Sequence, residues 1–543
     1  MSKLKLLTIE LIIALSLGIF ASYMYMTETL FFENMNKKFT DMFFHLRGEI
    51  EPSKDIVIVD IDEKSLSQLG QWPWSRDKVA TILTNLTKAE VGIIGLDIVF
   101  AEADRSSPKK VLSKFGFVHK DAEDYDAILA DVLANTPTIM GYIFDFEESM
   151  KKGDTPNIAT IIVEKNSQNR DFLPKAKGVI SNISILQSSS YSSGFFNTVP
   201  DSDGIVRSVP LLVSYDDTVF PSLSLEILRL VYGASKIVIN YSDIGITHIS
   251  LDELVIPTDR FGRLSVNYRG KSRLYKYISA VDIYDNSFHK EDISGKIVLL
   301  GTSAAGLLDL RATPFESVYA GVEIHATAID NALNQEFISH PSWIEAVDVL
   351  VIIVMLLAIV LFFALFGAIR TAIFSMLSMG LLFYMSYFLF VKEGIMLNLF
   401  YPLVSVTLLY LILTSLHYIF ESKQKELIKD KFSKKVSKAV AESLIKQGNS
   451  DVFEAKQREV SIFFSDIRGF TSISEKLNDP KKLIEFLNIY MTPMTEIITE
   501  SNGTVDKFIG DAIMAYWNAP NDVENHADVA VQSAVKQIKE LKK

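Results

Sequence analysis

Four long apolar segments constrain the fold of this chain more than any other feature of its sequence. A helix needs about 20 apolar residues to cross the hydrocarbon core of a bilayer. The segments lie at about residues 6–26, 343–367, 371–391 and 397–420. Short turns at residues 368–370 and 392–394 separate the last three, which predicts a bundle of helical hairpins. A cleaved signal peptide is the alternative for the first segment, although no small-residue cleavage site follows it.

Charge predicts the orientation of these spans. Six lysines crowd the exit of the last one: Lys423, Lys425, Lys429, Lys431, Lys434 and Lys435. The positive-inside rule therefore places the C-terminal region in the cytoplasm. Four crossings put both ends on the same side, so we expect both termini of a multi-pass protein of the cell membrane to be cytoplasmic. Glu10, inside the first span, is predicted to lie at headgroup level or to face another helix.

Composition predicts alternating membrane and globular parts and excludes some classes of function. The 543 residues are 48% hydrophobic and 22% charged, which favours a multidomain α/β membrane protein. The net charge of −12 argues against a nucleic-acid partner. Cysteine does not occur, which excludes disulfides, thiolate zinc sites and cysteine nucleophiles.

The region between the first and second spans, residues 28–342, is predicted to be an extracytoplasmic α/β domain. Short β-branched runs at residues 56–61, 91–96 and 297–301 indicate buried strands. Helical patterns lie between them, at residues 76–89 and 321–333. An apolar stripe from residue 31 to 46 has helical spacing and is expected to continue the first membrane helix outward and to pack on the domain.

This region resembles the CHASE2 family of extracytoplasmic sensors. The motifs that carry the resemblance are VDIDEKSL (59–66), GQWPWSR (70–76), DIVF (97–100), DGIVR (203–207), GTSAAGLLD (301–309), TP (313–314) and GVEIHA (321–326). Members of the family are typically followed by three membrane spans and a cytoplasmic signalling domain. The resemblance implies a sensor whose extracytoplasmic ligand is unknown.

Four aspartates of these motifs are open to two interpretations. Asp60, Asp62, Asp97 and Asp309 could line a pocket at the ends of strands, where α/β sheets usually bind ligands. Alternatively they cap helices and turns. His325 is either a sensor group or, as we expect more strongly, a structural histidine with satisfied hydrogen bonds.

Residues 421–450 are charged and helix-prone and predict a cytoplasmic linker. It is either a signalling helix that pairs with its copy in a dimer or a solvated linker helix. A last domain, residues 451–543, follows. An apolar run at 460–464 indicates a central strand that delivers Asp466 at its end, and Thr471 is expected to cap the next helix. An amphipathic helix at 480–500 precedes two strands, 504–508 and 512–517, whose hairpin turn carries Asp511.

Two strand-end carboxylates suit a hard divalent cation such as magnesium, which shares its oxygen ligands with substrate phosphates. The alternative is that Asp466 caps a helix and Asp511 only fills a turn. The motifs FSDIRGFT (464–471) and DKFIGD (506–511) resemble the two metal motifs of class III nucleotidyl cyclases. That resemblance implies a ferredoxin-like α+β catalytic domain in which Asp466 and Asp511 are catalytic and bind two ions, Mg²⁺ or Mn²⁺, with help from the Ile467 carbonyl.

The same resemblance assigns substrate contacts to Lys507, Phe470 and Thr471. Lys507 would contact the adenine of ATP bound mainly by the partner chain of a homodimer, so lysine favours an adenylate cyclase over a guanylate cyclase. The expected products are 3',5'-cyclic AMP and pyrophosphate. A complete domain of this family is considerably longer than the part that follows Arg458, so we expect the catalytic domain to be C-terminally incomplete. An inactive sensor or dimerisation protein is the alternative.

Overall fold

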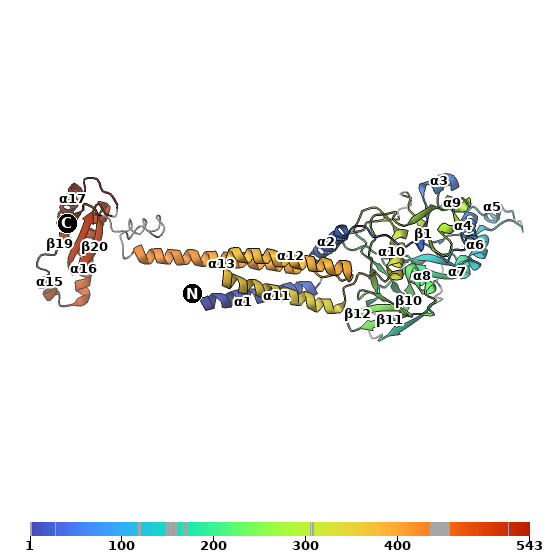
Figure 1. Ribbon diagram of the computed structural model, residues 1–543, viewed down its shortest axis with the longest axis horizontal. Helices are drawn as coiled ribbons and strands as arrows, with labels where there is room; N and C mark the ends of the chain where they lie inside the picture. The colour runs from blue at the N-terminus through green and yellow to red at the C-terminus, as the bar shows by residue number, and fades with distance from the viewer. Residues whose placement is uncertain are drawn as a thin grey trace. The chain divides into compact units, whose positions relative to one another are not determined.

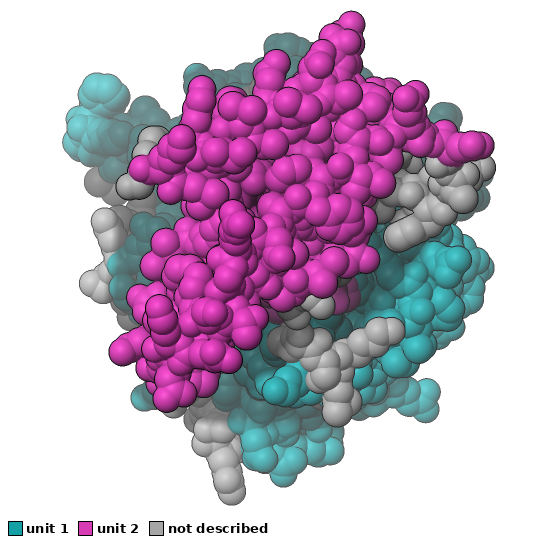
Figure 2. Space-filling view, turned by 90° about the vertical axis from the view of Figure 1, so that its left-hand side faces the viewer, with its two compact units in different colours: residues 1–411 teal, residues 412–543 magenta. Residues whose placement is uncertain are grey.

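The computed structural model describes residues 3–27, 29–117, 121–147, 151–152, 156, 160–166, 172–304, 306, 309–433, 457–519 and 521–542. The chain divides into two compact units, residues 1–411 and 412–543, which Figure 2 shows in different colours.

The helices of the first unit fall into a membrane set and a globular set (Figure 1). The membrane set is α1 (Lys3–Met26), α11 (Ser342–Phe366), α12 (Ala368–Lys392) and the start of α13 (Phe400–Ser433). The globular set is α2 (Leu30–Arg47), α3 (Glu63–Leu69), α4 (Arg76–Lys88), α5 (Pro108–Lys114), α6 (Tyr125–Ala134), α7 (Ser184–Ser189), α8 (Leu223–Val231), α9 (Ala280–Tyr284) and α10 (Gly321–Leu333).

The main sheet of the first unit has strand order β15-β1-β16-β2-β3-β6-β4, with β7 also paired to β3. Its strands are β1 (Ile56–Ile61), β2 (Ile93–Leu96), β3 (Thr138–Asp145), β4 (Lys151–Lys152), β6 (Gly178–Ile180), β7 (Ser192–Phe195), β15 (Lys276–Ser279) and β16 (Ile297–Thr302). A second sheet contains β5 (Ile161–Lys165), β11 (Lys236–Ser242), β12 (Gly245–Leu251) and β13 (Leu254–Pro257). Short pairs are formed by β8 (Ser208–Pro210) with β14 (Arg263–Ser265), β9 (Leu212–Tyr215) with β10 (Thr218–Pro221), and β17 (Leu310–Arg311) with β18 (Tyr319–Ala320).

Buried side chains cover both faces of the main sheet. Along β1, Ile56 and Ile58 join the cluster formed with α8 and α10, whereas Val57, Val59 and Ile61 join the cluster formed with α4, α6 and α9. Strands β15, β1, β16, β2 and β3 pair in parallel. Parallel strands covered on both faces are apolar along their whole length, which is why the predicted strands 56–61 and 297–301 match β1 and β16 closely.

The stripe at residues 31–46 forms a helix of its own rather than a continuation of α1. Helix α1 ends at Met26, and the backbone of Thr29 is extended before α2 begins at Leu30. The prediction that this stripe packs on the domain is confirmed, because Phe43 and Phe44 lie in the core cluster of α8 and α10. Phe43 also contacts Phe383 and Phe390 of α12.

The four predicted spans are the helices that are long and apolar enough to cross a membrane within the described part of the chain. Helix α11 contacts both α1 and α12, and the three helices run side by side in one bundle (Figure 1). Glu10 of α1 is buried, which agrees with the expected placement that faces another helix. The turn between α11 and α12 is Gly367 alone, because its positive φ of 77° reverses the chain and Ala368 already starts α12. Helix α13 continues to Ser433; the rest of the predicted linker, residues 434–450, lies outside the described residues.

A buried polar cluster joins the membrane helices to the chain at the edge of the α/β domain; we call it the Asp348 cluster. The Asp348 carboxylate of α11 accepts hydrogen bonds from Tyr25 of α1 (3.1 Å) and from the Asn398 side chain (2.7 Å), and lies 3.2 Å from the His340 imidazole. Asn398 is in turn bonded to Asn36 of α2. One carboxylate on α11 therefore contacts α1 and the segments just before α11 and α13.

We expect Asp348→Ala to destabilise the first unit by about 1–3 kcal/mol, because it leaves partly buried donors without their acceptor. Thermal unfolding of the detergent-solubilised protein would show this as a fall in Tm. Glu345→Ala, an exposed carboxylate one turn earlier on α11, is the matched control and should leave Tm nearly unchanged. Equal effects of the two substitutions would contradict the structural role of the cluster.

The second unit contains a sheet of order β19-β21-β20 packed on two helices. Its elements are β19 (Ser461–Ser465), α15 (Phe470–Leu477), α16 (Pro480–Glu500), β20 (Thr504–Ile509), β21 (Ala512–Trp517) and α17 (His526–Glu540). Ile513, Ala515 and Trp517 of β21 form its core with α16 and α17. In the described residues β19 lies at the edge of the sheet and β21 in the centre, so the prediction of a central strand at 460–464 was wrong: the run is apolar on both faces, but Ile462 (59% exposed) and Phe464 (62% exposed) are uncovered.

Candidate functional site

Strand register brings the two predicted metal-binding aspartates to the same end of the sheet in the second unit. Strands β19 and β21 are antiparallel, with Ser465 opposite Ile513. Asp466 directly follows β19, and Asp511 directly precedes β21. The turn between β20 and β21 has two residues, Gly510 and Asp511, with φ of 67° at the glycine, as in a type II′ hairpin. Both carboxylates therefore lie where β19 ends and β21 begins.

The turn after Asp466 is built differently from the prediction. Helix α15 begins at Phe470, and its N-cap is Gly469, whose φ of 77° is left-handed and favours glycine. Thr471 thus lies inside the first turn and does not cap it, since no side chain caps this helix. Asp466 does not cap it either, which removes one structural explanation for this carboxylate. The Ile467 carbonyl accepts a 3.2 Å hydrogen bond from the Phe470 amide and has a second lone pair.

Lys507 lies on the open face of the sheet. The register of β20 with β21 shifts between Val505 and Lys507, so that Lys507 pairs with Met514. Met514 also pairs with Phe464, and paired residues share a face. Strand alternation adds Asp466, two residues after Phe464, to that face. Lys507 is 60% exposed and lies 3.1 Å from the Asp506 carboxylate.

The donor set at this sheet end fits a divalent metal ion shared with a substrate. Two carboxylates and one backbone carbonyl are hard oxygen ligands, and magnesium usually takes only one or two carboxylates plus phosphate oxygens. No group of three or more His, Cys, Asp or Glu side chains gathers as a metal centre among the described residues. A site of this composition therefore suits a nucleotide that completes the coordination.

The carboxyl edge of the main sheet in the first unit carries the other four aspartates. Asp62 is the N-cap of α3, where it accepts a 2.8 Å hydrogen bond from the Ser65 amide, so the capping interpretation is correct for this residue. Asp60 is buried on β1; its Oδ2 accepts from Ser303 (2.6 Å) and Arg273 (3.2 Å), and its Oδ1 has no partner. Burial raises the pKa of Asp60, although the Ser303 hydroxyl and Arg273 oppose this.

Asp97 and Asp309 form a pair of carboxyl groups at the same edge. Asp97 follows β2 and is 7% exposed, and neither of its carboxyl oxygens has a hydrogen-bond partner. Burial raises its pKa to about 7. Burial and the charge of Asp97 likewise raise the pKa of Asp309 to about 7. The sequence does not distinguish this pair from the capping Asp62, because the groups that surround each side chain come from distant segments.

His325 of α10 is a structural histidine. Its Nε2 lies 3.1 Å from the Phe196 carbonyl and its Nδ1 lies 2.9 Å from the Ser224 hydroxyl. A carbonyl only accepts, so Nε2 carries the proton and Nδ1 accepts from Ser224. Burial lowers the pKa of this imidazole, which is therefore neutral at pH 7. The structural interpretation of His325 is supported.

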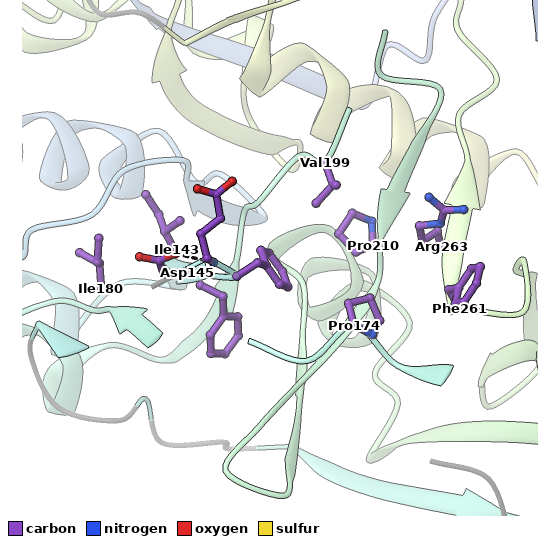
Figure 3. Close-up of a pocket in the computed structure, with 11 residues that line it drawn as sticks. Ile143, Asp145, Pro174, Ile180, Val199, Pro210, Phe261 and Arg263 are labelled. Carbon is purple, nitrogen blue, oxygen red and sulfur yellow. Dashed lines mark hydrogen bonds between the residues drawn. The ribbon is translucent and has the colours of Figure 1, made fainter. Parts of the chain in front are cut away.

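A cavity of about 650 Å³ lies elsewhere in the first unit (Figure 3). Apolar side chains such as Ile143, Pro174 and Phe261 form most of its wall, and Asp145 and Arg263 lie on opposite sides of it. Arg263 is already paired with Asp259 at 2.6 Å. The cavity is large enough for a small molecule, but the ligand expected from the sequence stays a prediction.

Comparison with known families identifies both units. The CHASE2 domain family matches residues 12–365, well over half of the chain. The chain belongs to the CHASE2 family. The adenylate and guanylate cyclase catalytic domain family matches residues 452–543, so the CHASE2 domain is combined with sequence of a class III cyclase domain. Both predicted resemblances are confirmed.

Several cyclases are similar to part of the chain. An adenylate cyclase of Anabaena cylindrica is 39% identical over 109 residues, which make up 20% of this chain and 22% of that protein. A terminal-differentiation-specific adenylate cyclase of Dictyostelium discoideum is 46% identical over 85 residues, 16% of this chain and 4% of that protein.

Solved structures of a guanylyl cyclase and of an adenylyl cyclase are also similar to part of the chain. The guanylyl cyclase Cya2 is 41% identical, covers 15% of this chain and 40% of its own, and has a TM-score of 0.14. The adenylyl cyclase CyaB from P. aeruginosa is 36% identical, covers 16% and 46%, and has a TM-score of 0.15. The chain spans less than half the length of each of these four proteins.

Proposed function

We propose that this protein is a membrane-bound, receptor-type adenylate cyclase that converts ATP to 3',5'-cyclic AMP and pyrophosphate. The observation that carries the proposal is the register of β19 and β21, which puts Asp466 and Asp511 at one end of the sheet, with Lys507 on the open face beside them. The adenylate cyclases among the relatives support the choice of product.

In this proposal Asp466 and Asp511 hold two ions, Mg²⁺ or Mn²⁺, and the Ile467 carbonyl assists. Bound metal would supply Lewis acidity at the 3'-hydroxyl and charge neutralisation at the phosphates. Lys507 donates a hydrogen bond to the adenine, and Phe470 and Thr471, in the first turn of α15, line the phosphate side. The uncovered face of the sheet is where a second copy of the chain brings its ATP, so the active unit is a homodimer.

The membrane arrangement supports regulation from outside the cell. We propose that the CHASE2 domain, residues 28–342, is extracytoplasmic. Residues 1–27 make the first membrane crossing, and residues 343–420 make three more. Residues 451–543 then face cytosolic ATP. The lysines that follow the last apolar segment, from Lys423 onward, support this orientation. An unknown extracytoplasmic ligand would then control the cyclase through residues 421–450.

The test is nucleotide turnover by the native protein in membranes. With Mg²⁺ or Mn²⁺ it should form cyclic AMP from ATP faster than cyclic GMP from GTP, and a chelator should stop the reaction until metal is restored. Preference for GTP would identify a guanylate cyclase. No product from either nucleotide would favour the catalytically inactive sensor or dimerisation protein.

We expect Lys507→Glu to lower the rate with ATP by about 10-fold or more. The charged hydrogen bond that Lys507 would donate to the adenine is lost, and the glutamate carboxylate would repel the acceptor atom of the base. Initial rates with ATP and GTP measure this. Lys482→Glu makes the same charge change on exposed α16 and is the control. An unchanged ratio of ATP to GTP turnover in Lys507→Glu would contradict the role of Lys507 in purine selection.

A further inference from the structure

The Asp97 carboxyl of the CHASE2 domain is an unusual group that the proposed reaction does not use. It is 7% exposed, and both of its oxygens lack a hydrogen-bond partner. An ionised carboxylate without donors is strongly disfavoured in such surroundings. The group must therefore be neutral, with a bound proton, or be neutralised by a cation.

Its neighbours favour the proton. Divalent metals that bind oxygen take several ligands, and no group of three or more potential ligand side chains gathers within the described ranges. The carboxyl group whose charge couples to Asp97 is Asp309. Asp309 packs against the first residue of α10, where a Cβ on Gly321 would lie 2.8 Å from the Asp309 carboxyl carbon.

Asp309 has the environment that better favours an ionised carboxylate. Its Oδ1 lies 3.3 Å from the Arg311 guanidinium, and the N-terminus of α10 favours a negative charge there. Asp97 is influenced by the Arg311 charge only at longer range, and no hydrogen-bond donor reaches its oxygens. Once the pair has lost one proton, this geometry favours the remaining proton on Asp97, whose oxygens have no donor, although the charge of Asp97 also raises the pKa of Asp309.

Three other titratable groups come from two elements, α10 and β1. His325 of α10 is neutral, since its two nitrogens are committed to Phe196 and Ser224. Asp60 of β1 pairs with Gly301 of β16, the strand between β1 and β2. Its carboxylate accepts a hydrogen bond from Arg273. Glu323 of α10 is buried, and its Oε2 accepts from the Arg273 amide.

We propose that Asp97 and Asp309 form a proton-binding pair, which makes the CHASE2 domain responsive to the pH of the compartment that it faces. Both groups have their pKa raised to about 7, so the response falls near neutral pH. Helix α10 starts at this pair, and residues 334–341 join its end to α11, the first membrane helix after the domain. Loss of the proton puts a repulsive charge beside the start of α10. The inference is independent of cyclase activity.

The sign of the stability change follows from these pKa values. Asp97 has an ordinary pKa of about 4 in the unfolded chain and of about 7 in the folded protein. Between about pH 4 and pH 7, therefore, Asp97 holds a proton in the folded protein but not in the unfolded chain. The stabilisation is fully present below about pH 4 and is lost as pH rises through about 7.

The experiment is thermal unfolding of the whole protein in detergent between about pH 5 and 8.5. We expect the Tm of the wild type to fall by about 4 °C or more over this range, and Asp97→Asn, which mimics the protonated carboxyl at every pH, to reduce this fall. Asp309→Asn removes the neighbouring charge and should move the midpoint to lower pH. Asp62→Asn is the control: asparagine also caps helices, and the Asp62 pKa is lowered rather than raised.

Infrared difference spectra give a second, direct measurement. The C=O stretch of a protonated carboxyl should be present at about pH 6, diminish by about pH 9, and be reduced in Asp97→Asn. An unchanged pH slope of Tm and an unchanged infrared band in Asp97→Asn would overturn the proposal. So would a rise in wild-type Tm on adding Ca²⁺ or Mg²⁺ at alkaline pH that Asp97→Asn abolishes, because a metal would then be the occupant.

Discussion

Asp466→Asn is expected to lower cyclic AMP formation by about 10²–10³-fold, the loss typical when one group that stabilises charge in a transition state is removed. Asparagine has nearly the same size, but it lacks the negative charge with which Asp466 would hold metal at the end of β19. Cyclic AMP formed per minute by membranes that contain equal amounts of each variant measures the effect. Asp511→Asn should behave in the same way, since β21 starts beside the same sheet end.

Asp479→Asn is the matched control for both substitutions. Asp479 is the N-cap of α16 and accepts a 2.9 Å hydrogen bond from the Lys481 amide. Asparagine caps helices about as well, so activity should remain. Full activity of Asp466→Asn would exclude the proposed metal site. Equal losses in Asp466→Asn and Asp479→Asn would show that the domain tolerates no change of this kind, and the assignment of Asp466 would fail.

Arg269→Met is expected to destabilise the CHASE2 domain by about 3–5 kcal/mol, because it leaves a buried carboxylate without its cation. Arg269 is 1% exposed, and its Nε lies 3.0 Å from Asp330, which is fully buried on α10. Methionine fills much of the volume of the arginine side chain without carrying its charge. A large fall in Tm of the solubilised protein, and loss of folded protein from membranes, would report this destabilisation.

Arg263→Met is the control for the buried pair. Arg263 and Asp259 form a 2.6 Å ion pair in which both side chains are about one-third exposed, and pairs of this kind contribute about 0–1 kcal/mol. Adding Asp330→Asn to Arg269→Met should recover part of the lost stability, because the uncompensated charge is then removed. A small effect of Arg269→Met, or no recovery in the double variant, would contradict this account.

Periodic elements could be predicted from the sequence almost to the residue. The predicted ranges 56–61, 321–333, 480–500 and 512–517 coincide with β1, α10, α16 and β21. Each has an apolar pattern that only one regular structure can bury. The two motifs that we predict to bind metal were recognised from their resemblance to those of class III cyclases, and the register of β19 and β21 brings them to one end of the sheet.

Most of the errors concern features that depend on distant residues; the cap of α15 is the exception, because it was decided by a neighbouring residue. Helix α2 separates from α1 and packs on α12 through Phe43, a contact across more than 300 positions of the chain. Thr471 has a good capping side chain, but Gly469 occupies the left-handed position that starts α15. Asp62 and Asp97 look equivalent in sequence, yet only Asp62 has a nearby amide to accept from. Partners of this kind cannot be read from local spacing.

The Asp348 cluster also sets where chimaeric receptors can be joined. Its members come from α1, α11, residue 340 and the segment that starts α13, and all of them lie in the unit of residues 1–411. A crossover between α10 and α11 would pair His340 of one parent with the Asp348 position of another. A crossover inside α13, after residue 411, would transfer the cluster whole, so that output domains can be exchanged while the receiving half keeps its own hydrogen bonds.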